Sequence, residues 1–163
     1  MPIQPVISNT SPLIGLLGLN CLPLLRDLYT EVWIPREVEK EFLVVDETFY
    51  RKVLNKAPWI KVIDVTDSQS ASIYQGIDAG EGEVLALAVE HDARFVILDE
   101  NKGRQIATKI GLKVKGTLGV LLDAKEEGLI VAIKPLLIQL QANGIRLSES
   151  LINKVLQEAG EID

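Results

Sequence analysis

Residues 78–100 read DAGEGEVLALAVEHDARFVILDE, and this stretch decides the fold class. Asp78 and Glu81 have the D-x-x-E spacing of a capping box, which predicts a helix over residues 81–90. Residues 95–98 form a continuous apolar run, as expected for a parallel strand that is covered on both faces. A helix that leads into such a strand is the repeating unit of an α/β fold with a parallel sheet.

The alternation of short apolar runs and helical patterns continues on both sides of this stretch. The sequence predicts strands at residues 6–7, 32–34, 60–65, 95–98 and 112–114. Ser11 and Pro12 are interpreted as the N-cap and the first residue of the first helix. Further helices are expected at residues 22–29, 35–42, 46–55, 67–75, 81–90, 101–110, 117–127, 135–143 and 148–159. Since neither a repeat nor a linker is visible, residues 1–163 are expected to form a single domain, a three-layer α/β/α sandwich with a mainly parallel sheet.

Composition restricts the chemistry that the chain can perform. Among 163 residues there are 17 Lys and Arg and 23 Asp and Glu, so the formal net charge is −6. This acidity disfavours a protein that coats nucleic acid without specificity. Cys21 and His91 are the only residues of their types, which excludes an intrachain disulfide and a metal site made of several histidines. Any metal chemistry must therefore use carboxylates.

No targeting signal is expected at the N-terminus. The longest uncharged stretch, residues 1–25, is interrupted by four prolines and has no basic region ahead of an apolar run. It is too interrupted for a transmembrane helix. We therefore expect a cytoplasmic protein without a membrane-spanning segment.

Acidic and polar residues cluster where an open α/β sheet binds its ligands, outside the carboxyl ends of the strands. Four groups are expected there: residues 8–10, Glu37 with Glu41, Glu81 with Glu83, and Asp99 with Glu100. Glu37 and Glu41 share one helix face, where like charges cost roughly 0.2–0.5 kcal/mol that a bound cation would remove. Taken alone, each acid also fits a solvated charged face or an acid-enriched helix N-terminus.

Five motifs occur in order along the chain and together carry a family resemblance. They are Asn9-Thr10-Ser11-Pro12-Leu13-Ile14, Ile34-Pro35-x-x-Val38-x-x-Glu41, Asp78-x-Gly80-Glu81-x-Glu83-Val84-x-Ala86-Leu87-Ala88, Asp99-Glu100-x-Lys102-Gly103-Arg104-x-x-Ala107 and Gly116-Thr117-Leu118-Gly119-Val120-Leu121-Leu122-x-Ala124-Lys125. With these motifs the chain resembles PIN-domain proteins, in the branch related to VapC-type toxin ribonucleases (PIN-like proteins of the DUF3368 type). The resemblance covers nearly the whole chain.

The resemblance implies a metal-dependent ribonuclease that is the toxin component of a toxin–antitoxin pair. PIN domains gather three or four acidic side chains around Mg²⁺ or Mn²⁺, and such hard cations take oxygen ligands. By position, Glu41 matches the second acid of the family and Glu83 the third, while Asp99 and Glu100 compete for the fourth. Asn9 stands at the place of the first acid, which is usually Asp.

Neighbouring residues receive supporting roles. The resemblance suggests that the hydroxyls of Thr10 and Ser11 lie near the metal; alternatively, both residues cap the start of the first helix. Glu81 would be a neighbour of the site or a helix-capping residue. Lys102 and Arg104 would contact RNA phosphates, or Arg104 would instead hold a carboxylate of the site. The expected partners are an RNA substrate, a protein antitoxin and a second copy in a homodimer.

Asn9 also leaves an alternative open. An amide supplies an oxygen but no charge, so the chain is either a nuclease with a weakened metal site or a PIN fold without catalysis that binds RNA or protein. A mononucleotide-binding domain is disfavoured because the Gly-rich residues 78–82 are acidic where a phosphate cradle would be neutral or basic.

Overall fold

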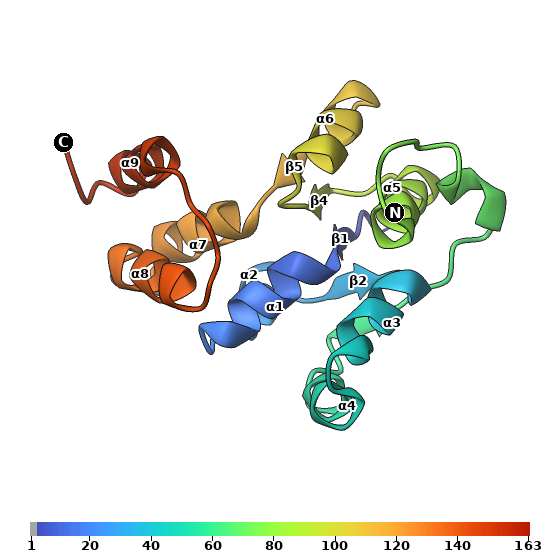
Figure 1. The fold of residues 1–163 in the computed structure, drawn as a ribbon, viewed down its shortest axis with the longest axis horizontal. Coiled ribbons are helices and arrows are strands. Elements are labelled where there is room, and N and C mark those ends of the chain that lie inside the picture. The colour runs from blue at the N-terminus through green and yellow to red at the C-terminus, as the bar shows by residue number, and fades with distance from the viewer. Residues whose placement is uncertain (1–2) are drawn as a thin grey trace.

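A five-stranded parallel sheet forms the centre of the molecule in the computed structural model, which describes residues 3–163 (Figure 1). The strands are β1 (Val6–Ser8), β2 (Val32–Ile34), β3 (Ile60–Val62), β4 (Phe95–Ile97) and β5 (Val114–Lys115), and they lie in the order β3-β2-β1-β4-β5. Ile7 of β1 pairs with Trp33 of β2 on one side and with Val96 of β4 on the other. The direction of winding therefore reverses between β1 and β4, which is where open α/β sheets bind ligands.

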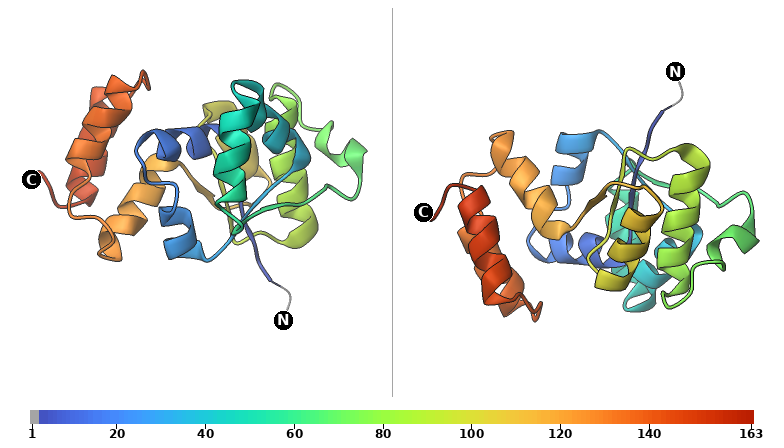
Figure 2. Two further views of the ribbon diagram at one scale, coloured as in Figure 1. Left: turned by 90° about the horizontal axis from the view of Figure 1, so that it is seen from below. Right: turned by 90° about the horizontal axis from the view of Figure 1, so that it is seen from above.

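Helices cover both faces of this sheet. They are α1 (Thr10–Gly18), α2 (Leu24–Tyr29), α3 (Arg36–Val44), α4 (Glu47–Asn55), α5 (Ala79–His91), α6 (Asn101–Lys109), α7 (Thr117–Glu126), α8 (Lys134–Ala142) and α9 (Glu149–Glu158), with the short 3₁₀ helix η1 (Ser68–Ala71) ahead of α5. Helices α1 and α2 lie on one side of the sheet and α5 and α6 on the other (Figures 1 and 2). The fold is the three-layer α/β/α sandwich that the sequence predicts.

Helix α3 crosses the carboxyl edge of the sheet. It packs against both α1 and α5, which lie on opposite faces. The helix begins after Pro35, which adopts an extended conformation. Val38 and Phe42 lie on the same face of the helix and are completely buried. Glu41 lies in this helix, so it is carried to the edge where the strands end.

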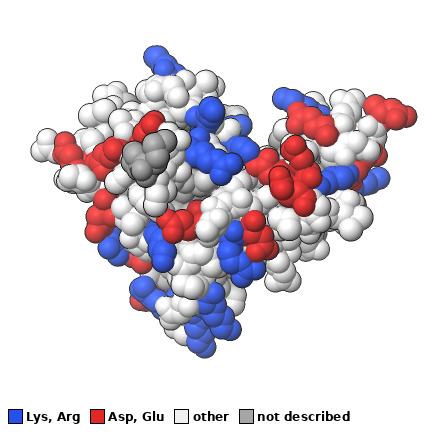
Figure 3. All heavy atoms as spheres, turned by 180° about the vertical axis from the view of Figure 1, so that it is seen from behind, with Lys and Arg blue, Asp and Glu red and all other residues white. Residues whose placement is uncertain are grey.

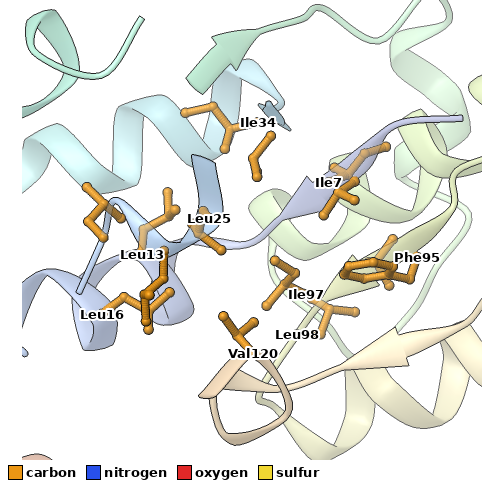
Figure 4. Close-up of a cluster of buried hydrophobic side chains, with 14 of the residues drawn as sticks. Ile7, Leu13, Leu16, Leu25, Ile34, Phe95, Ile97, Leu98 and Val120 are labelled. Carbon is orange, nitrogen blue, oxygen red and sulfur yellow. The ribbon is translucent and has the colours of Figure 1, made fainter. Parts of the chain in front are cut away.

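The core fixes the geometry of that edge. Strands β1 and β4 are buried along their whole lengths, as expected for strands covered on both faces. Figure 4 shows strand side chains packed with residues from α1, α2 and α7; the labelled ones are Ile7, Leu13, Leu16, Leu25, Ile34, Phe95, Ile97, Leu98 and Val120. Burying each such side chain contributes about 1.5–3 kcal/mol, so the edge rests on a rigid support.

Helices α8 and α9 form a lobe beside the sandwich (Figure 2). Glu161, after α9, joins this lobe to α7. Its carboxylate accepts hydrogen bonds from Lys125 Nζ at 2.9 Å and from the backbone N–H groups of Ile133 and Lys134 at 2.7 and 3.0 Å. Burial opposes ionisation of Glu161, but these bonds outweigh it and lower the pKa of the carboxyl. Residues of α6, β5, α7 and α9 line a groove of about 1010 Å³, and side chains of both charges are among them (Figure 3).

Two local predictions are wrong. The helix predicted over residues 67–75 is only η1, and Gly76 with φ +84° follows it. The first helix begins at Thr10 with Asn9 as its N-cap, so Pro12 is its third residue. Proline is tolerated there because the first four N–H groups of a helix have no partner within it. Among residues 3–163, no helix has the length and apolar character needed to cross a membrane.

Candidate functional site

Polar side chains from four segments reach the carboxyl edge beside the switch between β1 and β4. Asn9 follows β1, Glu41 lies in α3, Glu81 lies in the first turn of α5 and Asp99 follows β4. Which of them act together depends on the contacts that each side chain makes.

Glu41 lies between the first turns of α1 and α5. Its Oε2 accepts a hydrogen bond from the Thr10 hydroxyl at 3.0 Å. On its other side it lies against Gly80, where an added Cβ would be 2.9 Å from the carboxylate carbon of Glu41. Burial raises the pKa of the Glu41 carboxyl and the charge of Asp78 adds to the rise, whereas the Thr10 hydroxyl opposes it. The ionised form of Glu41 therefore needs further stabilisation.

Glu81 is buried, with 5% of its surface exposed. It completes the predicted capping box: its backbone N–H donates to Asp78 Oδ1 at 2.8 Å, and its Oε2 accepts from the Asp78 N–H at 3.1 Å. Its other oxygen, Oε1, is buried without a hydrogen-bond partner among the described residues. Burial raises the pKa of the Glu81 carboxyl, and the charges of Asp78, Glu100 and Glu41 raise it further, whereas the bond from the Asp78 N–H opposes the rise. The ionised form of Glu81 is therefore disfavoured, and the charge of Glu41 contributes to this.

Asn9 supplies a second orphaned oxygen at the same edge. Its backbone N–H donates to the carbonyl of Ile97 at 3.0 Å, which extends the pairing of β1 with β4 by one residue. The side chain is 3% exposed and makes no cap bond to α1. Within the described part of the chain, Asn9 Oδ1 has no hydrogen-bond partner. An unpartnered buried oxygen is costly, which suggests that a group outside the protein satisfies it.

Asp99 caps a helix in addition to lining the edge. Its two carboxylate oxygens accept hydrogen bonds from the N–H of Thr117 at 2.7 Å and from the hydroxyl of Thr117 at 2.6 Å, at the first residue of α7. Glu100 is exposed and is the N-cap residue of α6, without a side-chain cap bond. Its negative charge contributes to the raised pKa of Glu81. Of the two, Asp99 is held in place by its bonds to Thr117.

Glu83 makes a different contact from the one expected of a third metal ligand. Its Oε1 accepts a hydrogen bond from the backbone N–H of Glu37 at 3.1 Å, so it stabilises the start of α3. Successive helical residues turn by about 100°, so Glu81 and Glu83 project about 160° apart around the helix axis. The expected cluster of Glu41, Glu83 and Asp99 is not formed: across residues 3–163, no group of three or more Asp, Glu, His or Cys is arranged to hold a metal.

The predicted supporting residues divide into two kinds. Thr10 bonds to Glu41 as described, whereas Ser11 is exposed in the first turn of α1. Arg104 Nη1 donates to the carbonyl of Leu98 at 2.7 Å and so fixes the turn after β4. Lys102 is exposed and forms no ion pair with the residues that the structure describes.

The oxygens at this edge fit a hydrated hard cation. Mg²⁺ is commonly bound through one or two carboxylates and keeps several waters, so it does not require a ready-made cluster of three acids. Glu41 and Glu81 supply two carboxylates, and Asn9 supplies a neutral amide oxygen. Two of these residues hold buried oxygens without partners, Asn9 Oδ1 and Glu81 Oε1. A cation at this place would satisfy these atoms and remove the repulsion between the carboxylates.

A comparison with protein families decides the relationship. A family model for PIN domains of the DUF3368 type matches residues 5–161. The chain belongs to the PIN-domain family. The resemblance seen in the sequence is thus confirmed at the level of the family, whose fold is nuclease-like and whose members commonly use divalent metal ions. A search of curated proteins found no significant match.

Sequence reasoning treated Glu81 of this PIN domain as a neighbour of the site or a helix cap, and it missed the burial of this carboxylate at the edge of the sheet. One signal was available. In a capping box the Glu side chain turns back toward the helix N-terminus, and α5 starts at the carboxyl edge of the sheet. That geometry brings the carboxylate of Glu81 to the edge and directs Glu83 elsewhere.

Proposed function

We propose that this PIN domain is a Mg²⁺- or Mn²⁺-dependent ribonuclease and the toxin component of a toxin–antitoxin pair. The observation that carries the proposal is the set of oxygens that Glu41, Glu81 and Asn9 bring to the carboxyl edge. Glu81 Oε1 and Asn9 Oδ1 are buried and have no partner among residues 3–163, and Glu41 is half-buried. Buried oxygens without partners have little use in a stable core, because they cost free energy. The set is well suited to a divalent cation.

In this proposal Glu41 and Glu81 hold the cation, Asn9 contributes its amide oxygen, and Asp99 or Glu100 adds negative charge at the rim. A cation held there would supply a water of lowered pKa and would neutralise charge on the phosphate. Thr10 orients Glu41 through its 3.0 Å hydrogen bond, and the capping box fixes one oxygen of Glu81 so that the other faces the site. Glu83 is the competing candidate for the third acid.

RNA is the proposed substrate. Two basic side chains that come after Asp99 and Glu100 in the sequence, Lys102 and Arg104, would bind its phosphate backbone. Lys102 is exposed beside the Asp99-Glu100 turn and is available for a phosphate. Arg104 uses Nη1 for the carbonyl of Leu98, which leaves its other N–H groups for a phosphate oxygen. A protein antitoxin and a second copy of the chain are further proposed partners, and they rest on the family alone.

The test is RNA cleavage by the purified chain with Mn²⁺, with Mg²⁺ and with excess chelator. We expect cleavage that requires the metal and that is lost in Glu41→Gln, since the amide removes a charge from the site. Glu127→Gln is the matched control, because Glu127 is an exposed acid at the end of α7 and should be replaceable. Metal-independent cleavage, or equal cleavage by wild type and Glu41→Gln, would contradict the proposal.

Asn9 supports a second candidate, a PIN domain that binds RNA or protein without cleaving it. The amide leaves the site one negative charge short of the family pattern. In that case the wild type binds RNA and cleaves none with either metal, and Glu41→Gln binds as well as the wild type. The cleavage assay therefore separates the two functions.

A further inference from the structure

Two groups of glycines in the chain differ in what requires them. One group needs glycine for its backbone conformation: Gly111, Gly128, Gly144 and Gly160 have φ between +72° and +94°. An added Cβ would meet nothing within 4 Å at any of these four positions. They occupy the left-handed region that favours glycine after helices.

A second group has no such backbone requirement. Gly80 lies in the first turn of α5 and Gly103 in the first turn of α6, and Gly116 is the extended N-cap residue of α7 with φ −95°. Every L-residue adopts these conformations. Alanine is also the better helix former, so glycine at positions 80 and 103 weakens the helix. The space beside these three residues must supply the reason for glycine.

One carboxylate lies in each of these spaces. A Cβ on Gly80 would overlap the carboxylate of Glu41, with 2.9 Å to its carbon and a still closer approach to Oε1. A Cβ on Gly103 would be 3.2 Å from the unpartnered Oε1 of Glu81.

The third space, beside Gly116, is bounded by the turn after β4. A Cβ on Gly116 would be 2.8 Å from Asp99 Oδ1 and 2.9 Å from Arg104 Nη1. Packing alone does not produce this pattern. At Gly82, in contrast, the obstructing atom is the backbone oxygen of Ala71 at 2.7 Å, as expected of a glycine that lets two segments approach.

We infer that Gly80, Gly103 and Gly116 are positioning residues, each of which leaves the room that one carboxylate of the acidic site occupies. The inference rests on the proposed function, since it gives the three carboxylates a common purpose. It explains why three glycines that the backbone does not require stand beside three acids of one edge. Glycine weakens the helix at positions 80 and 103, and at all three positions it leaves room for a carboxylate.

Gly80 gives the sharpest case. The atoms that an alanine would displace are the end of the Glu41 side chain, which can rotate aside without moving α3 or α5. The fold should therefore tolerate Gly80→Ala, while the carboxylate of Glu41 should leave its place beside Thr10.

The experiment has two parts. Isothermal titration calorimetry measures Mn²⁺ binding to the full chain, and thermal melting measures its stability. We expect Gly80→Ala to weaken Mn²⁺ binding by about tenfold to 100-fold, the range for residues that orient a ligand, with a melting temperature equal to or above that of the wild type. Gly119→Ala is the matched control, because Gly119 is also in a first helical turn and its Cβ would be 3.4 Å from the aliphatic Cβ of Lys115. Its Mn²⁺ affinity should stay within about twofold of the wild type.

A double-variant cycle tests the cause. Shortening Glu41 to Asp withdraws its carboxylate from position 80, so in the Glu41→Asp background Gly80→Ala should change Mn²⁺ affinity by less than about twofold. Equal affinity of Gly80→Ala and wild type would overturn the inference while leaving the proposed function intact. Unfolding of Gly80→Ala would also overturn it, because the role of Gly80 would then be packing. A wild type that binds no Mn²⁺ would contradict the proposed function itself and the inference with it.

Discussion

Asn9 places a neutral amide where one more carboxylate would complete the cluster with Glu41 and Glu81. Its side chain is buried and its Oδ1 has no partner among the described residues. The replacement Asn9→Asp is nearly isosteric and adds a charge to a site for a hard cation, so we expect tighter Mn²⁺ binding and faster RNA cleavage. Calorimetry and a cleavage assay on the two proteins measure this. Unchanged affinity together with unchanged cleavage would place Asn9 outside the metal site.

Glu81 gives a prediction about stability and pH. Its folded-state pKa is raised above the ordinary value of 4.5, so in metal-free protein the folded state holds this proton more tightly than the unfolded state does. The free energy of unfolding therefore falls as the pH rises from 4.5 through the raised pKa. Glu81→Gln removes the ionisation and keeps the capping box, so the variant should be more stable than the wild type at pH 7.

Below the ordinary pKa that difference should disappear, because Glu81 is then protonated in both states. Urea denaturation of both proteins without metal, at pH 7 and at about pH 4, measures the difference in their free energies of unfolding at each pH. A difference of the same size at both pH values would show that the effect of the substitution is unrelated to the charge of Glu81.

At the scale of elements, Asp99 joins the end of β4 to the start of α7. Both of its oxygens bond to Thr117, one to the N–H and one to the hydroxyl. Asp99→Ala removes both bonds and should lower the free energy of unfolding by about 1 kcal/mol, as loss of a helix cap does. Asp99→Asn keeps an acceptor for the N–H and should lose less. Urea denaturation of the two variants provides the ranking, and equal stability of Asp99→Ala and wild type would refute the capping role.

Most elements could be predicted from the sequence because their signals are local. The capping box of Asp78 and Glu81 and the apolar run at residues 95–98 both appear in the structure as expected. The start of α1 could not be predicted, because the Thr10 hydroxyl bonds to Glu41, which lies 31 residues away in the chain, and does not cap its own helix. The strand order has the same limitation, since it depends on pairings between distant segments.

The candidate site shows the same division. The sequence identified the edge and its acids, including Glu41, from motifs that lie within single helices and turns. It ranked Glu83 above Glu81 as the third acid, although Glu81 lies in the first turn of α5 and Glu83 one step beyond it. Only the burial of Glu81 and the bond from Glu83 to the start of α3 separate them.

At the scale of the whole molecule, a chain with a net charge of −6 must bind RNA through a local group of cations. Lys102 is the exposed candidate beside the site. Lys102→Ala should weaken RNA binding in the absence of metal and reduce the slope of log K against log salt by about one. Lys56→Ala is the control, because Lys56 is exposed at the end of α4, ahead of β3 and therefore near the opposite edge of the sheet. An unchanged slope for Lys102→Ala would remove Lys102 from the RNA interface.

The most direct test of the central claim compares Glu81→Gln with Glu83→Gln. The two substitutions are chemically identical, lie two residues apart on α5 and each removes one negative charge. They differ in the place of the side chain, since Glu81 is buried in the capping box and Glu83 bonds to the start of α3. Mn²⁺ is titrated into the wild type and both variants by isothermal calorimetry. The account predicts that Glu81→Gln abolishes or strongly weakens Mn²⁺ binding while Glu83→Gln binds nearly as the wild type does. Loss of binding in Glu83→Gln with binding retained in Glu81→Gln would contradict it.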